Sequence, residues 1–290
     1  MYFYDEPVFR PPSEANSLIF QATLGCSWNK CAFCEMYSTK KFSVKPQEKL
    51  FAEIEQLSAH CPGTRKVFLA DGNAMVLSHA KLLAITKKLN QQFPKLGRIS
   101  AYALPSDMRS KTIEELESLR DQKLNFVYVG IESGDDELLR LINKSETAES
   151  TIQGLVHARR AGVRLSVMII LGLGGRKYSK QHAIRSAEVL NAIQPEYFST
   201  LVLSYPFGEK HFQSRVDYEH QSLSTKELLQ ELHLLIDRTQ LEGTIFRSDH
   251  ASNYLSLKGV LGKDKHELLK TIEYALSNPQ VLREEWMRGL

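Results

Sequence analysis

Residues 25–34 read GCSWNKCAFC and contain three of the four cysteines of the 290-residue chain. Thiolates are soft ligands that select iron-sulfur clusters, zinc or copper, and spacings of two to four residues let one loop surround a single metal centre. The fourth cysteine, Cys61, is distant in the sequence. Three local thiolates indicate a 4Fe-4S cluster on Cys26, Cys31 and Cys34, with one iron open to a ligand that is not protein.

The spacing of these cysteines also fits two other metal sites. A structural zinc site needs four ligands, and His60 or Cys61 could supply the fourth. The spacing C-x4-C-x2-C followed by a distant cysteine is also that of plant-type ferredoxins, which hold a 2Fe-2S cluster. The spacing alone does not decide between these sites, so the decision depends on the rest of the chain.

The composition is that of an ordinary globular protein, with 42% hydrophobic and 24% charged residues. A net charge of +3, with no run of Lys or Arg longer than two, gives no support for a nucleic-acid partner. The longest apolar run, residues 167–171, is too short to span a bilayer, and residues 1–10 lack the apolar core of a signal peptide. We therefore expect a cytoplasmic protein without membrane association, in a reducing compartment where clustered cysteines bind metal.

Short apolar runs alternate with amphipathic segments along most of the chain. Six strand-helix units in this order predict an α/β fold with a parallel sheet and helical crossovers, which we interpret as a partial (β/α)6 TIM-like barrel. Plant-type ferredoxins are small β-rich domains, so this architecture disfavours the ferredoxin interpretation. The predicted strands are residues 18–24, 66–70, 99–103, 126–131, 163–171 and 197–203.

The pattern changes after residue 203. We expect residues 1–203 to form the barrel core, and residues 204–290 to form a helical and loop extension that covers the barrel and contributes to the substrate site. The segment 243–257 is expected to be irregular. The strand at 163–171 is nearly all apolar, which predicts burial on both of its faces.

With this order of strands, the cysteine motif resembles that of the radical S-adenosylmethionine (radical SAM) superfamily, over about residues 18–203. In that family three cysteines follow the first strand, with an aromatic residue between the last two. Cys26, Cys31, Phe33 and Cys34 fill these places, although four residues separate the first two cysteines where the family usually has three. The resemblance implies a 4Fe-4S cluster whose open iron binds S-adenosylmethionine (SAM).

The resemblance also implies contacts with SAM at the ends of later strands. The turn at residues 70–73 stands where the family binds the amino group of SAM through backbone atoms, and Asn73 replaces the usual acidic residue. The segment 130–134 is similar to the one that contacts ribose and methionine, so Glu132 would accept from ribose hydroxyls and Ser133 would donate to the carboxylate.

Two further segments complete the implied SAM site. Lys144 occupies the place of an arginine that holds the SAM carboxylate, and lysine supplies the charge without the bidentate fork. Ile170 and Gly172 match the family's Gly-x-Ile-x-Gly motif that lines the adenine. The implied cofactor-binding residues are Phe33, Asp71, Gly72, Asn73, Glu132, Ser133, Lys144, Ile170 and Gly172.

The implied activity is reductive cleavage of SAM to a 5′-deoxyadenosyl radical, which abstracts a hydrogen atom from a substrate. The electron would come from a donor such as flavodoxin or ferredoxin. Only Cys61 is left for other roles, so an additional cysteine-ligated cluster is not expected. Alternatives are a tRNA-modifying or porphyrin-related member of the superfamily or, in another class, a non-catalytic iron-sulfur or zinc protein.

Candidate catalytic residues come from the C-terminal extension. Residues 247–254 combine five polar or charged groups with a tyrosine inside a long segment without periodicity, and such segments often carry function. Arg247 would bind a carboxylate or phosphate of the substrate, and His250 or Tyr254 would transfer a proton or hydrogen atom.

Overall fold

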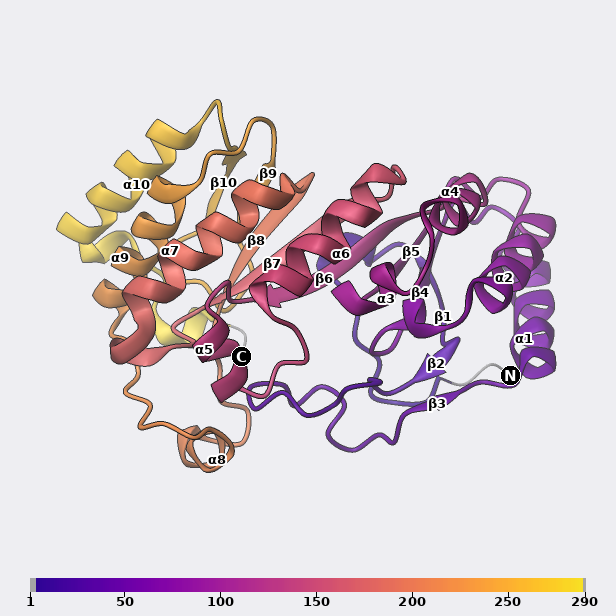
Figure 1. Cartoon of the computed structure of the whole chain (residues 1–290), viewed down its shortest axis with the longest axis horizontal. Helices are drawn as coiled ribbons and strands as arrows, with labels where there is room; N and C mark the ends of the chain where they lie inside the picture. Colours follow the sequence, from indigo (N-terminus) through magenta and orange to yellow (C-terminus); the bar gives the residue numbers. More distant parts are fainter. Residues whose placement is uncertain (1–3, 289–290) are drawn as a thin grey trace. The chain divides into compact units, whose positions relative to one another are not determined.

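The computed structural model describes residues 4–288 (Figure 1). The chain divides into two compact units, and each is described by itself. The first unit comprises Met1–Asn29, Cys34–Val129 and Gln153–Leu165, and the second comprises Lys30–Phe33, Gly130–Ile152 and Ser166–Leu290.

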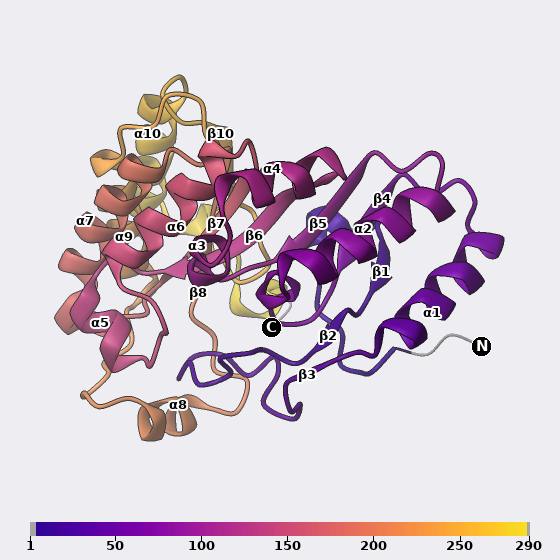
Figure 2. The ribbon, with the colours of Figure 1, turned by 45° about the vertical axis from the view of Figure 1, so that its right-hand side comes forward.

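The first unit carries four parallel strands, hydrogen-bonded in the order β1, β4, β5 and β6. Helices α1, α2 and α4 pack side by side, as Figures 1 and 2 both show. A two-stranded antiparallel ladder, β2 with β3, flanks the cysteine loop in the sequence. The elements are β1 (Leu18–Phe20), β2 (Thr23–Leu24), β3 (Ser43–Val44), α1 (Gln47–His60), β4 (Lys66–Leu69), α2 (His79–Gln92), β5 (Arg98–Tyr102), α3 (Pro105–Arg109) and α4 (Ile113–Asp121), with β6 (Leu124–Glu132) and α6 (Ala148–Arg160) passing from one unit into the other.

The second unit carries strands β7, β8 and β9 in parallel, with β10 antiparallel to β9. Helix α9 packs against both α7 and α10, and the three lie together in Figures 1 and 2. The elements are α5 (Asp136–Leu141), β7 (Arg164–Leu171), α7 (Gly175–Ile193), β8 (Tyr197–Val202), α8 (Glu209–Arg215), α9 (Thr225–Arg238), β9 (Ile245–Ser248), β10 (Leu257–Val260) and α10 (Lys265–Ser277). Single 3₁₀ turns lie at Pro12–Glu14, Ala74–Val76, Pro279–Val281 and Glu285–Met287.

Local sequence signals explain where several helices begin. Helix α4 starts after Thr112, whose side chain accepts from the backbone N–H of Glu115 while the Glu115 carboxylate accepts from that of Thr112. Ser224 and Glu227 form the same reciprocal capping box at the start of α9. Each box satisfies two backbone donors that the first turn of a helix would otherwise leave unpaired.

The predicted fold class is confirmed, since helices alternate with a mostly parallel set of strands. Each of the six predicted strands overlaps a strand of the structure. The predicted boundary at residue 203 stays a prediction. Beyond it, β9 pairs with β8 and α9 packs on α7, so the later residues extend the architecture of the second unit.

Two sequence predictions about strands were wrong. Burial alternates along β7, so only every second residue is fully buried, and the apolar residues on the other face are half-buried. The segment 243–257 is not irregular throughout, because it contains β9 and the first residue of β10. Both of these strands have four residues, which is too short for a clear period in the sequence.

Within residues 4–288, none of the helices combines the length and the apolar character needed to cross a membrane.

Candidate functional site

The predicted cluster ligands divide between the two units. Cys26 and Cys34 belong to the first unit and Cys31 to the second, and all three are half-buried cysteines that form no disulfide. Among residues 4–288, no three His, Cys, Asp or Glu side chains lie close enough together to hold a metal ion. The ligand role of the three cysteines therefore stays a prediction.

In the first unit, Asp71 holds the start of the cysteine loop. Its fully buried carboxylate accepts from the backbone N–H of Gly25 at 3.0 Å and from the Lys40 ammonium at 2.9 Å. The side chain of Gln21 donates to the other carboxylate oxygen at 3.2 Å. Asp71 itself has φ = 66°, an uncommon backbone conformation that the surrounding contacts have to maintain.

The next two residues also fix this loop. A Cβ on Gly72 would lie 2.2 Å from the Cα of Cys26 and 2.3 Å from the carbonyl oxygen of Gly25, so only glycine fits here. The Asn73 side chain accepts from the Ser27 N–H at 3.1 Å and donates to Asp107 at 2.9 Å. The side chains of Asp71 and Asn73 thus anchor the cysteine loop, while their proposed contacts with SAM stay predictions.

In the second unit, Phe33, Glu132 and Lys144 meet. The Lys144 ammonium donates to the Gly130 carbonyl at 2.8 Å, lies 3.4 Å from Oε1 of Glu132, and stands 6.0 Å from the centroid of the Phe33 ring. Burial raises the pKa of Glu132, and the Lys144 charge opposes that rise. This group places a cation, a carboxylate and an aromatic ring at the end of β6, which suits a zwitterionic ligand with an aromatic base.

The backbone around Glu132 is built for this arrangement. Glu132 has φ = 69°, and non-glycine residues in this region carry strain that is typical of functional sites. A Cβ on Gly130 would lie 1.8 Å from Oε1 of Glu132, so glycine makes room for the carboxylate. The backbone conformation of Glu132 and the glycine at position 130 together allow the carboxylate to lie where it does.

The segment around Cys31 packs within the second unit. The Ala32 N–H donates to the Ile142 carbonyl at 2.8 Å, and Arg215 of α8 donates to the Cys31 carbonyl at 2.9 Å. Phe33 and Ile170 pack on one apolar cluster, which brings together two of the predicted cofactor contacts. The buried members of that cluster are Ala32, Leu138, Leu139, Ile142, Leu173, Leu203, Phe212 and Val216.

A buried pair that was not predicted, His182 and Glu231, links two other predicted SAM contacts. Nδ1 of His182 lies 2.8 Å from Oγ of Ser133, and Nε2 of His182 lies 3.8 Å from Oε1 of Glu231. That Glu231 oxygen accepts from the N–H of Gly172 at 2.7 Å. Burial raises the pKa of Glu231 to about 7 and lowers that of His182 to about 4, so both side chains favour their neutral forms.

A signal for this pair did exist in the sequence. His182 and Glu231 occupy positions on the buried faces of α7 and α9, where most other residues are small or aliphatic. An ionisable side chain at such a position is rarely buried without a role or a partner.

The three candidate catalytic residues each have their own contacts. Arg247 lies in β9, is exposed, and donates to the Phe246 carbonyl at 2.8 Å. Nδ1 of His250 accepts from the Ser252 N–H at 3.1 Å, and burial lowers the pKa of this histidine. The Tyr254 hydroxyl donates to Glu285 at 2.8 Å. Their catalytic roles stay predictions.

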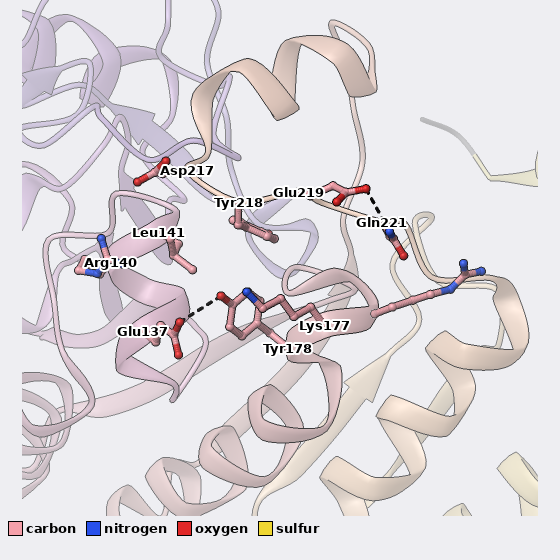
Figure 3. A pocket seen from close by; sticks show the side chains of 10 residues that line it. Glu137, Arg140, Leu141, Lys177, Tyr178, Asp217, Tyr218, Glu219 and Gln221 are labelled. Atoms are coloured by element: carbon pink, nitrogen blue, oxygen red, sulfur yellow. Dashed lines mark hydrogen bonds between the residues drawn. The ribbon is translucent and has the colours of Figure 1, made fainter.

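A pocket of about 550 Å³ lies elsewhere in the second unit (Figure 3). It is bordered by α5, the first turn of α7 and residues 217–221, and it contains none of the predicted site residues. Three carboxylates face three cations there, so its charge is balanced and does not favour an ionic ligand. The lining residues are Glu137, Arg140, Leu141, Arg176, Lys177, Tyr178, Asp217, Tyr218, Glu219 and Gln221.

Comparison with known proteins shows one family. The sequence model of the Radical SAM superfamily matches residues 20–187. Heme chaperone HemW of Bacillus subtilis is 22% identical over 180 residues, which are 59% of this chain and 47% of that protein. The tRNA-2-methylthio-N(6)-dimethylallyladenosine synthase of Chloroherpeton thalassium is 25% identical over 187 residues, 62% of this chain and 40% of that protein. The chain thus spans about half or less of these curated relatives.

Solved structures share the fold. Coproporphyrinogen III oxidase (HemN) from Escherichia coli, a radical SAM enzyme, superimposes with a TM-score of 0.56 at 19% identity, over 77% of this chain and 52% of that one. Methylornithine synthase (PylB) gives a TM-score of 0.52 at 15% identity, over 89% and 81% of the two chains. The family match and these structures confirm the resemblance first drawn from the cysteine motif.

Proposed function

Because this chain belongs to the radical SAM superfamily and is an enzyme of that class, we propose that it reductively cleaves SAM and uses the resulting radical to abstract a hydrogen atom from a substrate. The observation that carries this proposal is the meeting of Phe33, Glu132 and Lys144 at the end of β6. These residues come from three separate motifs in the sequence, and each was assigned to SAM by the resemblance.

The cofactors of the superfamily are a 4Fe-4S cluster and SAM, and the prediction of both is confirmed at the level of the family. When bound, the reduced cluster would supply one electron, which would cleave the sulfonium bond of SAM into methionine and a 5′-deoxyadenosyl radical. Two features of the chain support these cofactors. Gly72 lets the backbone after β4 approach the loop of Cys26, and the end of β6 offers charges of both signs.

The role of Lys144 and Glu132 is to hold the two polar ends of SAM. Lys144 would give its charge to the SAM carboxylate, and Glu132 would accept from the ribose hydroxyls. In the structure the two side chains pair with each other at 3.4 Å, a distance longer than a strong charge-assisted hydrogen bond. A ligand that offers Lys144 a carboxylate and Glu132 a hydroxyl donor could therefore replace this long contact.

Phe33 and Ile170 would exclude water from the reacting groups. Both pack on the apolar cluster of the second unit, so their positions are set by the core. A dry site protects a radical from side reactions and strengthens the electrostatic contacts of Lys144. No protein acid or base is needed for the cleavage itself.

The substrate and the electron donor are proposed only by class. Flavodoxin or ferredoxin would supply the electron. The relatives act in different pathways, so the tRNA-modifying and porphyrin-related alternatives both stay open. Cys61, the only other cysteine of these 290 residues, is the C-cap of α1, and therefore no cysteine set for a second cluster is present in them.

Anaerobic reconstitution with iron and sulfide tests the proposal. We expect about four irons per chain, and formation of 5′-deoxyadenosine from SAM under reduction. Cys31→Ala should abolish both, whereas Cys61→Ala should leave both intact. Retention of zinc instead of iron would support the non-catalytic alternative. So would a cluster whose electron paramagnetic resonance spectrum does not change when SAM is added.

A further inference from the structure

One face of the strands in the second unit is open. Val167, Ile169 and Leu171 of β7 are buried, whereas Met168 and Ile170 between them are only half-buried. Strand β8 shows the same alternation. Because successive side chains of a strand point to opposite faces, Met168 and Ile170 share one face, which we call the open face.

The strand register extends this face to β9 and β10. Met168 pairs with Ser199, Ser199 with Arg247, and Arg247 with Lys258. Paired residues on neighbouring strands point to the same side of a sheet. Arg247 and Lys258 therefore lie on the open face, in line with Met168.

The last two residues of this series of paired positions, Arg247 on β9 and Lys258 on β10, are both cations. Arg247 and Lys258 are directly opposite in the antiparallel β9–β10 pair, and both are exposed. Side chains so paired have Cβ atoms about 5 Å apart, and like charges in this position are destabilising. Within residues 4–288, Arg247 donates to the Phe246 carbonyl, and neither cation forms an ion pair with a carboxylate. Such an arrangement becomes favourable when an anion binds both groups.

The pair also lies near the predicted adenine contact. Strands are spaced about 4.8 Å apart, so the backbone of Arg247 is roughly 10 Å from that of Met168. Ile170 is two residues further along β7, about 7 Å away. A small molecule whose anionic group is bound by Arg247 and Lys258 would thus be long enough to reach Ile170.

We propose that Arg247 and Lys258 form an anion subsite, which binds a carboxylate or phosphate of a small acidic substrate and directs the rest of that substrate toward the SAM site. Arginine supplies a planar fork for two oxygens, and lysine adds a point charge. This inference rests on the proposed function. It keeps the anion-binding role that the sequence predicted for Arg247 and adds Lys258, which the sequence did not indicate. Two cations match one carboxylate or phosphate, whereas a net charge of +3 gives no support for a polyanion such as RNA.

The test is titration calorimetry of the reconstituted chain with inorganic phosphate and with citrate, at constant ionic strength. Arg247→Gln and Lys258→Gln should each weaken binding of at least one of these anions about tenfold or more. The matched control is Lys263→Gln, which removes an exposed cation just after β10 and should leave the affinity unchanged. Loss with phosphate alone would indicate a phosphate ester, and loss with citrate alone a carboxylic acid.

Three outcomes overturn the inference. They are equal anion affinity in wild type and both variants, equal loss in Lys263→Gln, and binding of an RNA oligonucleotide that depends on the same two residues. The unfolding free energy without anion provides a check on folding, because removing one of two like charges should leave it unchanged or raise it. Anion binding does not require SAM cleavage. A chain that binds anions but forms no 5′-deoxyadenosine would refute the proposed function and leave the subsite standing.

Discussion

Gly72 sets how closely the backbone after β4 can approach the cysteine loop. Gly72→Ala would place a Cβ 2.2 Å from the Cα of Cys26, and the atoms it meets are mostly backbone that cannot rotate away. We expect a loss of about 1–3 kcal/mol in the unfolding free energy of the iron-free chain, and reduced iron content after reconstitution. Gly63→Ala is the control, because its Cβ would meet nothing within 4 Å. Equal iron content in both variants would contradict this account of the loop.

The buried His182–Glu231 pair predicts opposite pH dependences. The pKa of Glu231 is raised to about 7 in the folded chain from an ordinary 4.5, so its contribution to stability is complete below pH 4.5 and is lost as the pH rises through 7. The pKa of His182 is lowered from 6.5 to about 4, so its contribution is complete above pH 6.5 and is lost as the pH falls through 4.

Removing one member at a time separates the two contributions. Relative to wild type, Glu231→Gln should gain unfolding free energy as the pH rises from 4.5 to 7, because the contribution that wild type loses there is absent. His182→Asn should gain relative to wild type as the pH falls from 6.5 to 4. Urea denaturation at several pH values measures both differences. Differences that do not change with pH would show that the pair does not titrate as its burial implies.

The sequence could predict site residues that lie in motifs, and it missed those placed by packing. Phe33, Glu132 and Lys144 were assigned from motif order, and the structure brings them together. His182 and Lys258 were missed, since one depends on how α7 meets Ser133 and the other on the register of β9 with β10. Neither contact is local in the sequence.

At the scale of elements, helix α8 contacts the cysteine loop, which the sequence did not predict. Arg215 donates to the Cys31 carbonyl at 2.9 Å, and Phe212 of the same helix packs in the cluster that contains Ala32. Arg215→Ala should loosen this segment and speed the loss of iron to a chelator several-fold. Lys210→Ala removes a cation from an exposed position of the same helix and should not change that rate. If both variants lose iron equally fast, the faster loss comes from removing a positive charge on α8 and not from losing the contact of Arg215 with Cys31.

The prediction of strands succeeded where apolar residues form a continuous run in the sequence. The predicted strands 66–70 and 163–171 correspond to β4 and β7, and each differs from the observed strand by one residue at one end. Strand β9 was missed because its four residues are two apolar residues followed by two polar ones, so they show no alternation. Helix α3 was missed because five residues make too few turns for an apolar stripe. Strand β7 was predicted. Because its sequence is almost entirely apolar, the sequence did not show that one face is buried and the other, the open face, is half-buried.

At the scale of the whole molecule, the binding of SAM should increase the unfolding free energy of the chain. A ligand that binds only the folded chain stabilises it by about 2.7 kcal/mol at one hundred times its dissociation constant. We expect SAM to raise the unfolding midpoint of the reconstituted chain, measured by differential scanning calorimetry under anaerobic conditions. Lys144→Met should reduce this SAM-induced rise, because it removes the charge that holds the SAM carboxylate.

Wild type and Lys144→Met have to be compared by the SAM-induced rise of the unfolding midpoint, and not by the midpoint itself. Lys144 opposes the burial of the Glu132 carboxylate, so Lys144→Met also raises the pKa of Glu132 further and changes the stability of the ligand-free chain. Lys180→Met, an exposed change on α7, is the matched control and should retain the full rise. A rise of equal size in Lys144→Met and wild type would show that SAM does not contact this side chain, and the site proposed at the end of β6 would have to be abandoned.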